Sequence, residues 1–167
     1  MRGWLLDTNV LSELRRPRPA AQVVAFVAAQ PVSRLYVSAA TLAEIRFGIE
    51  LIADPVRRAD LNGWLTHTLR PLFDGRVVPI AEDVLVRWRQ LVEAGRKSGH
   101  TYSEPDVLIA ASALVEQLIV VTRDVREFVE AGAAVLDPWT RTLSLPGRDR
   151  ILESLDRKDL LDVIIET

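Results

Sequence analysis

The sequence predicts an α/β fold, a three-layer α/β/α domain around a central, mostly parallel sheet of about five strands. Short apolar runs rich in Val, Ile and Leu alternate along the chain with longer helical patterns. The length of 167 residues, with 49% hydrophobic and 26% charged residues, suits one compact domain with a proper core. Strands that are apolar on both faces and separated by helices are typical of a parallel sheet covered on both sides.

Each element follows from this alternation. The strands are expected at residues 3–6, 34–38, 76–80, 118–122 and 133–137. Helices are expected at residues 20–30, 39–52, 55–73, 82–98 and 104–117, with a further helix between the last two strands. An amphipathic segment also begins just after the first strand, at Asn9. Together these elements predict one domain over residues 1–140, which we interpret as the functional unit.

The remaining residues, 141–167, are predicted to be a C-terminal appendage rather than a second domain. The stretch "TLSLPGR", residues 142–148, is interpreted as a linker because it contains Pro and Gly and follows the alternating pattern. Residues 149–165 are acidic and amphipathic, and we expect a helix followed by a strand-like end. Two placements stay open: the apolar residues pack on the body or on a second subunit, or the segment lies over the acidic pocket.

Composition excludes several classes of protein. There is no cysteine, so the chain has neither disulfides nor thiolate metal sites. No secretory signal and no apolar run long enough to span a bilayer are visible, which predicts a cytoplasmic protein with no membrane partner. The net charge of -2 argues against a strongly basic nucleic-acid coat. Acidic residues are concentrated in 149–167, however, so the body has a small basic excess that permits a phosphate-bearing partner.

Acidic residues stand where elements of the predicted sheet begin or end. Asp7 ends the first strand, and Asp124 follows the strand at 118–122. Asp106 lies in the first turn of the helix that leads into that strand, where the helix dipole favours an acid. Ligands of open α/β sheets gather at the carboxyl ends of the strands, so these acids are expected at one edge. Glu44 lies at the border of the apolar stripe of the helix at 39–52, so periodicity alone does not bring it there.

Carboxylates gathered in one pocket repel one another unless a cation lies between them. Mg²⁺ and Mn²⁺ prefer oxygen ligands, whereas the absence of Cys and the two His residues give little support to zinc. A divalent ion held in this way assists reactions at phosphodiesters. The predicted chemistry is therefore metal-assisted phosphoryl transfer. Taken alone, Asp7 has a simpler interpretation as the cap of the helix that follows it.

Four segments also resemble a known family. "LLDTNVLSEL", "SAATLAEIRFGI", "DVLIAASAL" and "VVTRDVREF", in this order and with these separations, resemble the signature blocks of PIN-domain ribonucleases. They are most similar to the VapC-type toxins of type II toxin–antitoxin systems, especially the FitB-like branch. The likeness runs from about residue 3 to Trp139. One block is weakly specific, but four blocks with an acid at each expected place are strongly specific.

The resemblance implies an activity and assigns residues to it. It implies an endoribonuclease that cleaves single-stranded or structured RNA, with transfer and ribosomal RNA as candidate substrates, by means of water activated by Mg²⁺ or Mn²⁺. It also implies a homodimer that a cognate antitoxin silences. The acids that would hold the metal and serve catalysis are Asp7, Glu44, Asp106 and Asp124. Asn9 and Thr122 match the polar positions beside the first and last acids, where they would orient a carboxylate or a water.

Other residues near these blocks receive weaker interpretations. Arg46 and Arg123 are close in sequence to Glu44 and Asp124, which makes them candidates for contact with RNA. Glu104 is an acid beyond the family pattern, either a ligand or a first-turn helix acid. If Asp7 binds metal, helix capping is expected to fall to Thr8 or Asn9. The two histidines, at positions 67 and 100, are interpreted as ordinary surface residues.

Two alternatives come from other functional classes. The segment "DTNV" is superficially similar to the nucleophile motif of haloacid-dehalogenase-type phosphatases and phosphoacceptor domains. That chemistry needs a second acid two residues after the nucleophile, and here the position is Asn9. The other alternative is a non-catalytic PIN-like module that only binds a protein. The loss of one acid of the quartet would indicate such a module, and all four acids are present.

Overall fold

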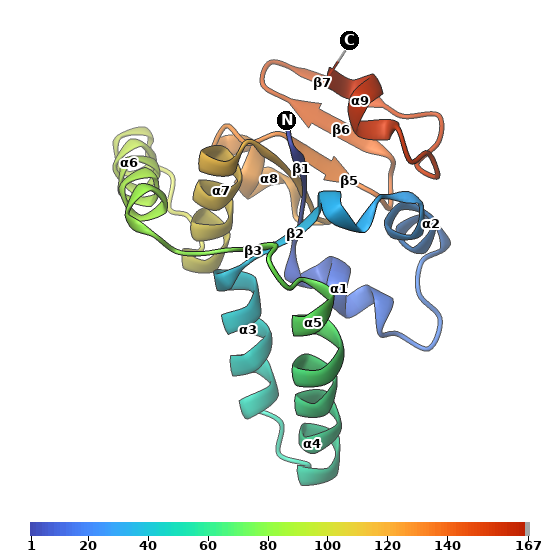
Figure 1. The fold of residues 1–167 in the computed structure, drawn as a ribbon. Coiled ribbons are helices and arrows are strands. Elements are labelled where there is room, and N and C mark those ends of the chain that lie inside the picture. The colour runs from blue at the N-terminus through green and yellow to red at the C-terminus, as the bar shows by residue number, and fades with distance from the viewer. Residues whose placement is uncertain (166–167) are drawn as a thin grey trace.

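A computed structural model describes residues 1–165 as a seven-stranded sheet with helices packed around it (Figure 1). The strands are β1 (Gly3–Leu6), β2 (Leu35–Ser38), β3 (Val77–Val78), β4 (Leu118–Val121), β5 (Val135–Asp137), β6 (Thr142–Leu145) and β7 (Arg148–Ile151). Their order in the sheet is β3-β2-β1-β4-β5-β6-β7. β1 to β5 pair in parallel, and β6 and β7 add two antiparallel strands. The α/β fold with a mostly parallel sheet is thus confirmed.

The helices lie between these strands, close to the predicted ranges. They are α1 (Thr8–Leu14), α2 (Ala21–Ala29), the short 3-10 turn η1 (Val32–Arg34), α3 (Ala39–Glu50), α4 (Pro55–Trp64), α5 (Arg70–Leu72), α6 (Glu82–Ser98), α7 (Glu104–Glu116), α8 (Val125–Glu130) and α9 (Leu160–Ile165). A π-helical turn, η2 (Leu65–Leu69), joins α4 to α5, so the predicted helix 55–73 is one continuous helical arm. Within residues 1–165, no helix combines the length and hydrophobicity needed to cross a bilayer.

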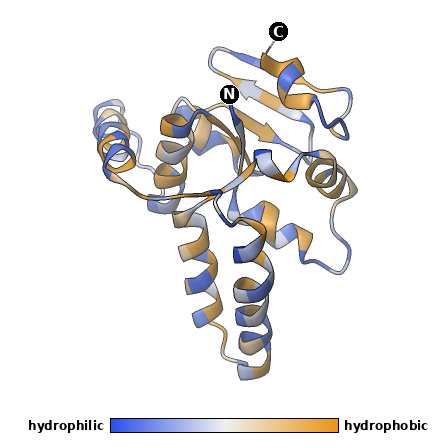
Figure 2. Cartoon of the chain, in the orientation of Figure 1, coloured by the Kyte–Doolittle hydropathy of each residue, from blue (hydrophilic) through white to orange (hydrophobic). Residues whose placement is uncertain are grey.

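Alternate residues of the central strands enter two separate hydrophobic clusters. Trp4 and Leu6 of β1 belong to the cluster that contains residues of α1, α2 and α9. Leu5 belongs to the cluster on the other face, with residues of α6, α7 and α8. Figure 2 shows that α7 is mainly hydrophobic, whereas the outermost helix, α6, is largely hydrophilic. The sheet is therefore covered on both faces, and its carboxyl edge is left for the connecting segments.

The register of β1 and β4 brings two polar positions side by side at this edge. Leu6 pairs with Val121, and the next amide, that of Asp7, donates a 3.0 Å hydrogen bond to the Val121 carbonyl. Asp7 and Thr122 are therefore the first residues beyond the paired strands. Because β1 and β4 are parallel, the helices that follow them, α1 and α8, begin at the same edge of the sheet.

The predicted linker at 142–148 is wrong, because these residues form β6 and the turn into β7. Pro146 and Gly147 make a two-residue hairpin loop, in which Gly147 has a φ of +83°. A Pro-Gly pair suits such a turn as well as it suits a linker. What distinguishes the two is the pairing of β6 with β5, which is a tertiary contact. Residues 141–167 are thus joined to the sheet of the domain.

The order predicted for 149–165 is also reversed: the strand comes first and the helix, α9, comes last. β7 is exposed along its length, so it has no apolar signature in the sequence. Leu160, Leu161 and Ile164 of α9 are buried in the same cluster as Trp4. The tail therefore packs on the body.

Two polar contacts show where this tail lies. The Gln30 side chain donates a 3.0 Å hydrogen bond to the Arg157 carbonyl, and Arg34 forms a 2.7 Å ion pair with Asp162. Arg34 directly precedes β2, so the tail lies beside the amino ends of the parallel strands, as Figure 1 shows for α9 and the N-terminus. It therefore does not cover the edge that carries Asp7.

Candidate functional site

Asp7 is almost fully buried, with 4% of its surface exposed, at the junction of β1 and α1. Its Oδ1 accepts a 2.7 Å hydrogen bond from the backbone N–H of Thr8, which makes Asp7 the N-cap of α1. Its Oδ2 accepts a 2.7 Å hydrogen bond from the Thr122 hydroxyl. The expectation that Thr8 or Asn9 caps this helix is wrong. A carboxylate has two oxygens, so one caps the helix while the other faces the site.

Asn9 and Thr122 lie against two of the predicted acids. Asn9 Nδ2 lies 3.2 Å from Asp7 Oδ2, 2.9 Å from Thr122 Oγ1 and 3.3 Å from Asp124 Oδ2. The Thr122 hydroxyl oxygen also accepts a 3.0 Å hydrogen bond from the backbone N–H of Asp124. Asn9 Oδ1 accepts from the backbone N–H of Arg123 at 3.3 Å. These contacts fix the end of β4 and the start of α8 relative to Asp7.

Glu44 reaches the site from α3, although periodicity alone did not place it there. Its Oε2 accepts a 2.7 Å hydrogen bond from the hydroxyl of Thr8, the residue next to Asp7. Glu44 and Thr8 both line a groove of about 480 Å³ between α1, α3 and α4. Sequence patterns indicated only a helix cap for Thr8, because no local pattern pairs it with a residue 36 positions away.

Asp106 and Asp124 lie at the starts of α7 and α8. Both line one shallow hollow, together with Ser103, Arg123 and Glu127. Asp106 is in the first turn of α7, and Asp124 is the N-cap residue of α8, with no cap hydrogen bond from its side chain. The carboxylate of Asp124 is thus free of the capping duty that one oxygen of Asp7 performs.

The charges of this group are not compensated. Burial raises the pKa of Asp106 to about 6, with repulsion from Asp7, Asp124 and Glu127 adding to the effect. Burial also raises the pKa of Asp7, against the hydrogen bonds from Thr122 and Thr8, and Glu44 and Asp124 raise it further. The pKa of Glu44 is raised by burial and by Asp106. Three acids with raised pKa values mark a place that lacks positive charge.

The donor set fits a hard divalent cation in residue type and position. It consists of carboxylates from four elements at one edge of the sheet, with hydroxyl and amide groups beside them. As the side chains stand within residues 1–165, no three His, Asp or Glu groups lie close enough together to hold an ion. The hydroxyls of Thr8 and Thr122 and the amide of Asn9 occupy several of the carboxylate oxygens instead.

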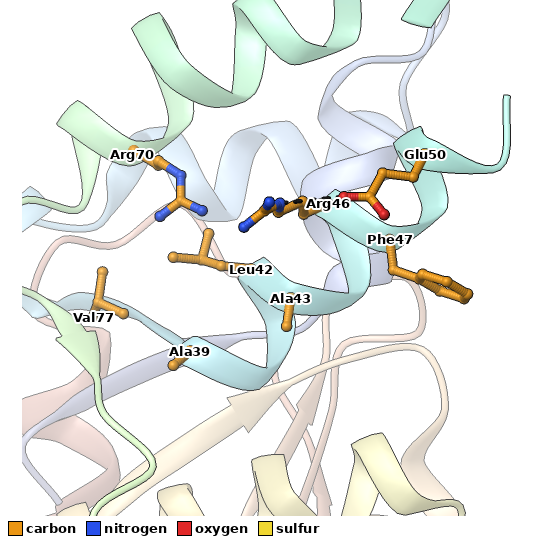
Figure 3. Close-up of a pocket in the computed structure, with 8 residues that line it drawn as sticks. All are labelled: Ala39, Leu42, Ala43, Arg46, Phe47, Glu50, Arg70 and Val77. Atoms are coloured by element: carbon orange, nitrogen blue, oxygen red, sulfur yellow. Dashed lines mark ion pairs between the residues drawn. The ribbon is translucent and has the colours of Figure 1, made fainter.

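The two arginines predicted to contact RNA lie in different surroundings. Arg123 lines the hollow of Asp106 and Asp124, and its guanidinium lies 5.3 Å from the centre of the Trp139 ring. Arg46 forms a 3.4 Å ion pair with Glu50. As Figure 3 shows, it lines a separate hollow with Phe47 and Arg70, which Glu44 does not line. Contact of either arginine with RNA stays a prediction.

Glu104 and His100 differ in how far they are buried. Glu104 is exposed in the first turn of α7 and does not line the hollow of Asp106 and Asp124. The interpretation of His100 as an ordinary surface residue is wrong, because it is largely buried between Glu127 and Glu130. These partners lie 27 and 30 residues away along the chain, so no local pattern reveals them.

Comparisons with known proteins show which family the chain is similar to. The profile of the PIN domain matches residues 4–133. The chain is 38% identical to Toxin FitB of Neisseria gonorrhoeae, over 81% of this chain and 97% of that protein. It is 36% identical to VapC ribonuclease Y4jK of Sinorhizobium fredii, over 81% and 96%.

Solved structures show the same likeness. The structure of FitAcB from Neisseria gonorrhoeae superposes with a TM-score of 0.77 at 38% identity, over 81% of this chain and 98% of that one. The structure of FitAB bound to an IR36 DNA fragment gives a TM-score of 0.76 at 36% identity, over 81% and 95%. The profile match, the relatives and the fold all agree. The chain therefore belongs to the PIN-domain family.

Proposed function

We propose that this protein is a Mg²⁺- or Mn²⁺-dependent endoribonuclease that acts in the cytoplasm as the toxin of a type II toxin–antitoxin module. The observation that carries the proposal is that Asp7, Glu44, Asp106 and Asp124 lie near one edge of the sheet, close enough that the charge of each raises the pKa of at least one other. Asn9 and Thr122 form hydrogen bonds with Asp7, and Asn9 also with Asp124. Relatives named as a toxin and as a ribonuclease support it.

The contacts of each residue indicate its role in the proposed reaction. The four carboxylates would hold the ion, and because the pKa values of three of them are raised, a cation bound there would stabilise their charged forms. Asn9 and Thr122 orient Asp7 and Asp124, so that little rearrangement is needed when substrate arrives. The bound ion would supply positive charge to the phosphodiester and lower the pKa of a water near it.

Arg123 is the residue best placed to meet an RNA phosphate. It lines the same hollow as Asp106 and Asp124, and its guanidinium lies over the ring of Trp139. Contacts of this kind between Arg and phosphate position a nucleic acid without reading its sequence. We therefore propose single-stranded or structured RNA as substrate, with transfer and ribosomal RNA as the first candidates.

The proposal includes a homodimer and a cognate antitoxin. Phe47 on α3 and Leu51, which directly follows this helix, are 61% and 69% exposed, an unusual position for large apolar side chains. Phe47 lies beside Arg46, Arg70 and Glu50, so the same surface offers charges of both signs to a second copy (Figure 3). The solved relatives are FitAcB and FitAB, the latter bound to a DNA fragment, which supports a partner protein for this chain too.

The phosphatase alternative is less well supported. Its second acid would stand at position 9, where the Asn9 amide instead donates to Asp7 and Thr122. An amide cannot protonate a leaving group. A non-catalytic module would not need three buried or half-buried acids whose charges raise one another's pKa values.

RNA cleavage with purified protein tests the proposal directly. Wild type with Mn²⁺ should cut RNA, and EDTA or Asp7→Asn should reduce cleavage by at least about a hundredfold. Asp74→Asn, which removes an exposed acid in the turn after α5, is the matched control and should cut normally. Cleavage that survives both chelation and Asp7→Asn contradicts the mechanism. Growth arrest on expression, relieved by the adjacent partner gene, would separate a toxin from a housekeeping nuclease.

A further inference from the structure

The segment between α6 and α7, residues 99–103, is held in one conformation by close contacts. Gly99 ends α6 with a φ of +76°, and the backbone N–H of His100 donates a 2.9 Å hydrogen bond to the Gly95 carbonyl. A Cβ on Gly95 would lie 2.8 Å from Tyr102 Cε2 and 2.9 Å from the His100 carbonyl oxygen. Only glycine at position 95 therefore leaves room for this path of the chain.

The side chain of His100 ties this segment to α8. Its Nε2 lies 3.3 Å from Glu127 Oε2 and its Nδ1 lies 2.7 Å from Glu130 Oε2. Tyr102 packs edge-on against the imidazole, with 4.4 Å between ring centres. The exposed fractions of the His100, Glu127 and Glu130 side chains are 20%, 28% and 33%, so water competes only partly for these contacts. Both ring nitrogens donate at once only when the imidazole is protonated.

The position of this bridge relates it to the acidic site. His100 stands six residues before Asp106, and Glu127 stands three residues after Asp124. Glu127 also lines the hollow that Asp106 and Asp124 share. The bridge therefore joins the entry of the helix that carries Asp106 to the helix that Asp124 begins. A shift of about 1 Å between groups that must act together is enough to impair catalysis strongly.

We propose that His100 is a positioning residue, which sets the spacing between Asp106 and Asp124 by clamping the 99–103 segment to Glu127 and Glu130 on α8. It touches neither metal nor RNA, and it acts through the two helices. This inference rests on the proposed function for its kinetic consequence, whereas its consequence for Mn²⁺ binding does not require RNA cleavage.

The first test compares His100→Ala, His100→Gln and wild type in Mn²⁺ binding by calorimetry, without RNA. Loss of an orienting partner of this kind costs about tenfold in metal affinity. His100→Ala should therefore bind Mn²⁺ about tenfold more weakly. His100→Gln keeps an amide donor and should recover part of the loss. His67→Ala, which removes the exposed histidine of η2, is the control and should bind as wild type does.

The second test uses steady-state cleavage of a single-stranded RNA at saturating Mn²⁺, below the unfolding temperature of every variant. His100→Ala should lower kcat about tenfold with KM nearly unchanged, because RNA binding does not use His100. Gly95→Ala pushes the same segment without altering any charge and should act in the same direction. If Gly95→Ala does not fold, the His100 variants still test the positioning role.

The outcomes distinguish the positioning role of His100 from the proposed nuclease function. Wild-type cleavage with unchanged Mn²⁺ affinity and kcat in folded His100→Ala overturns the positioning role and leaves the proposed nuclease intact. If the wild type binds Mn²⁺ but does not cleave RNA, the proposed nuclease function is contradicted. The calorimetric comparison then still tests the positioning role of His100. A purely structural role would lower the unfolding temperature and leave both readouts within about twofold.

Discussion

The hydroxyl of Thr122 donates a 2.7 Å hydrogen bond to Oδ2 of Asp7, and both side chains are buried. The two residues are 115 positions apart and become neighbours only because β1 and β4 pair in parallel. This bond stabilises the charged form of the Asp7 carboxylate and opposes the rise in its pKa that burial causes. It therefore links the register of the sheet to the charge of the site.

Thr122→Val should weaken both stability and activity. The substitution keeps the shape but removes the donor to Asp7, so the pKa of Asp7 should rise further and Mn²⁺ should bind less well. Loss of a buried hydrogen bond to a charged group costs about 1.5–3 kcal/mol, measured by denaturant unfolding.

Thr41→Val is the matched control for that experiment. Thr41 is fully buried, and its hydroxyl has no hydrogen-bond partner among the described residues. Its replacement should be neutral or stabilising, because no bond is lost and an unsatisfied group is removed. Equal losses in the two variants would contradict the role given to Thr122.

Without metal, removing the Asp106 charge should stabilise the protein at high pH. The pKa of Asp106 rises from 3.8 to about 6 on folding. A raised acid pKa favours the folded state below the unfolded value, and this contribution is lost as pH rises from about 4 through 6. In EDTA, Asp106→Asn should therefore unfold a few degrees above wild type at pH 8 and no higher at pH 4.

Glu104→Gln provides the control for this pH dependence, since Glu104 is an exposed acid in the same helical turn. The difference in unfolding temperature between Glu104→Gln and wild type should not change with pH in the way that it does for Asp106→Asn. The affinity of the wild type for Mn²⁺ should show the opposite trend and increase as pH rises through 6, because protons and metal compete for the carboxylates. A gain for Asp106→Asn at pH 4 equal to that at pH 8 would refute the assignment.

Phe47→Asp should separate the proposed dimer. Phe47 is 61% exposed on α3, and a charge there cannot be buried against a second copy without a large cost. The dissociation constant, measured by light scattering over a dilution series, should rise at least about tenfold. Val86→Asp on α6, where the native side chain is 50% exposed, should leave the dimer intact. A wild type that is monomeric at every concentration would refute the dimer itself.

The C-terminal tail should contribute to stability and not to catalysis. Leu161 is 1% exposed in the cluster that contains Trp4, so Leu161→Ala should cost about 2–5 kcal/mol in denaturant unfolding. Ile151→Ala, at a side chain 73% exposed, should cost little. RNA cleavage by folded Leu161→Ala should match wild type, because the tail lies beside the amino ends of the parallel strands and Asp7 lies at their carboxyl ends. Unchanged stability after deletion of 142–167 would contradict this account.

Strong local patterns made much of this fold predictable. β1 and β4 are short apolar runs buried on both faces, and α6 spans Glu82–Ser98 as its periodicity predicts. The acids at the ends of these strands could be located too, because parallel strands carry their carboxyl ends to one edge. Asp7 and Asp124 follow from that rule, Asp106 was located by its place in the first turn of a helix, and similarity to the PIN-domain blocks added Glu44.

Only the tertiary structure decided the rest. The hairpin of β6 and β7 depends on pairing with β5, and α9 depends on the cluster around Trp4. The bridge from His100 to Glu127 and the separation of Arg46 from Glu44 likewise depend on how helices pack. Sequence alone determined which residues could form strands, helices and a cation site, because those tendencies are local. The partners of each side chain were decided by contacts between distant segments, whose energy no single stretch of sequence contains.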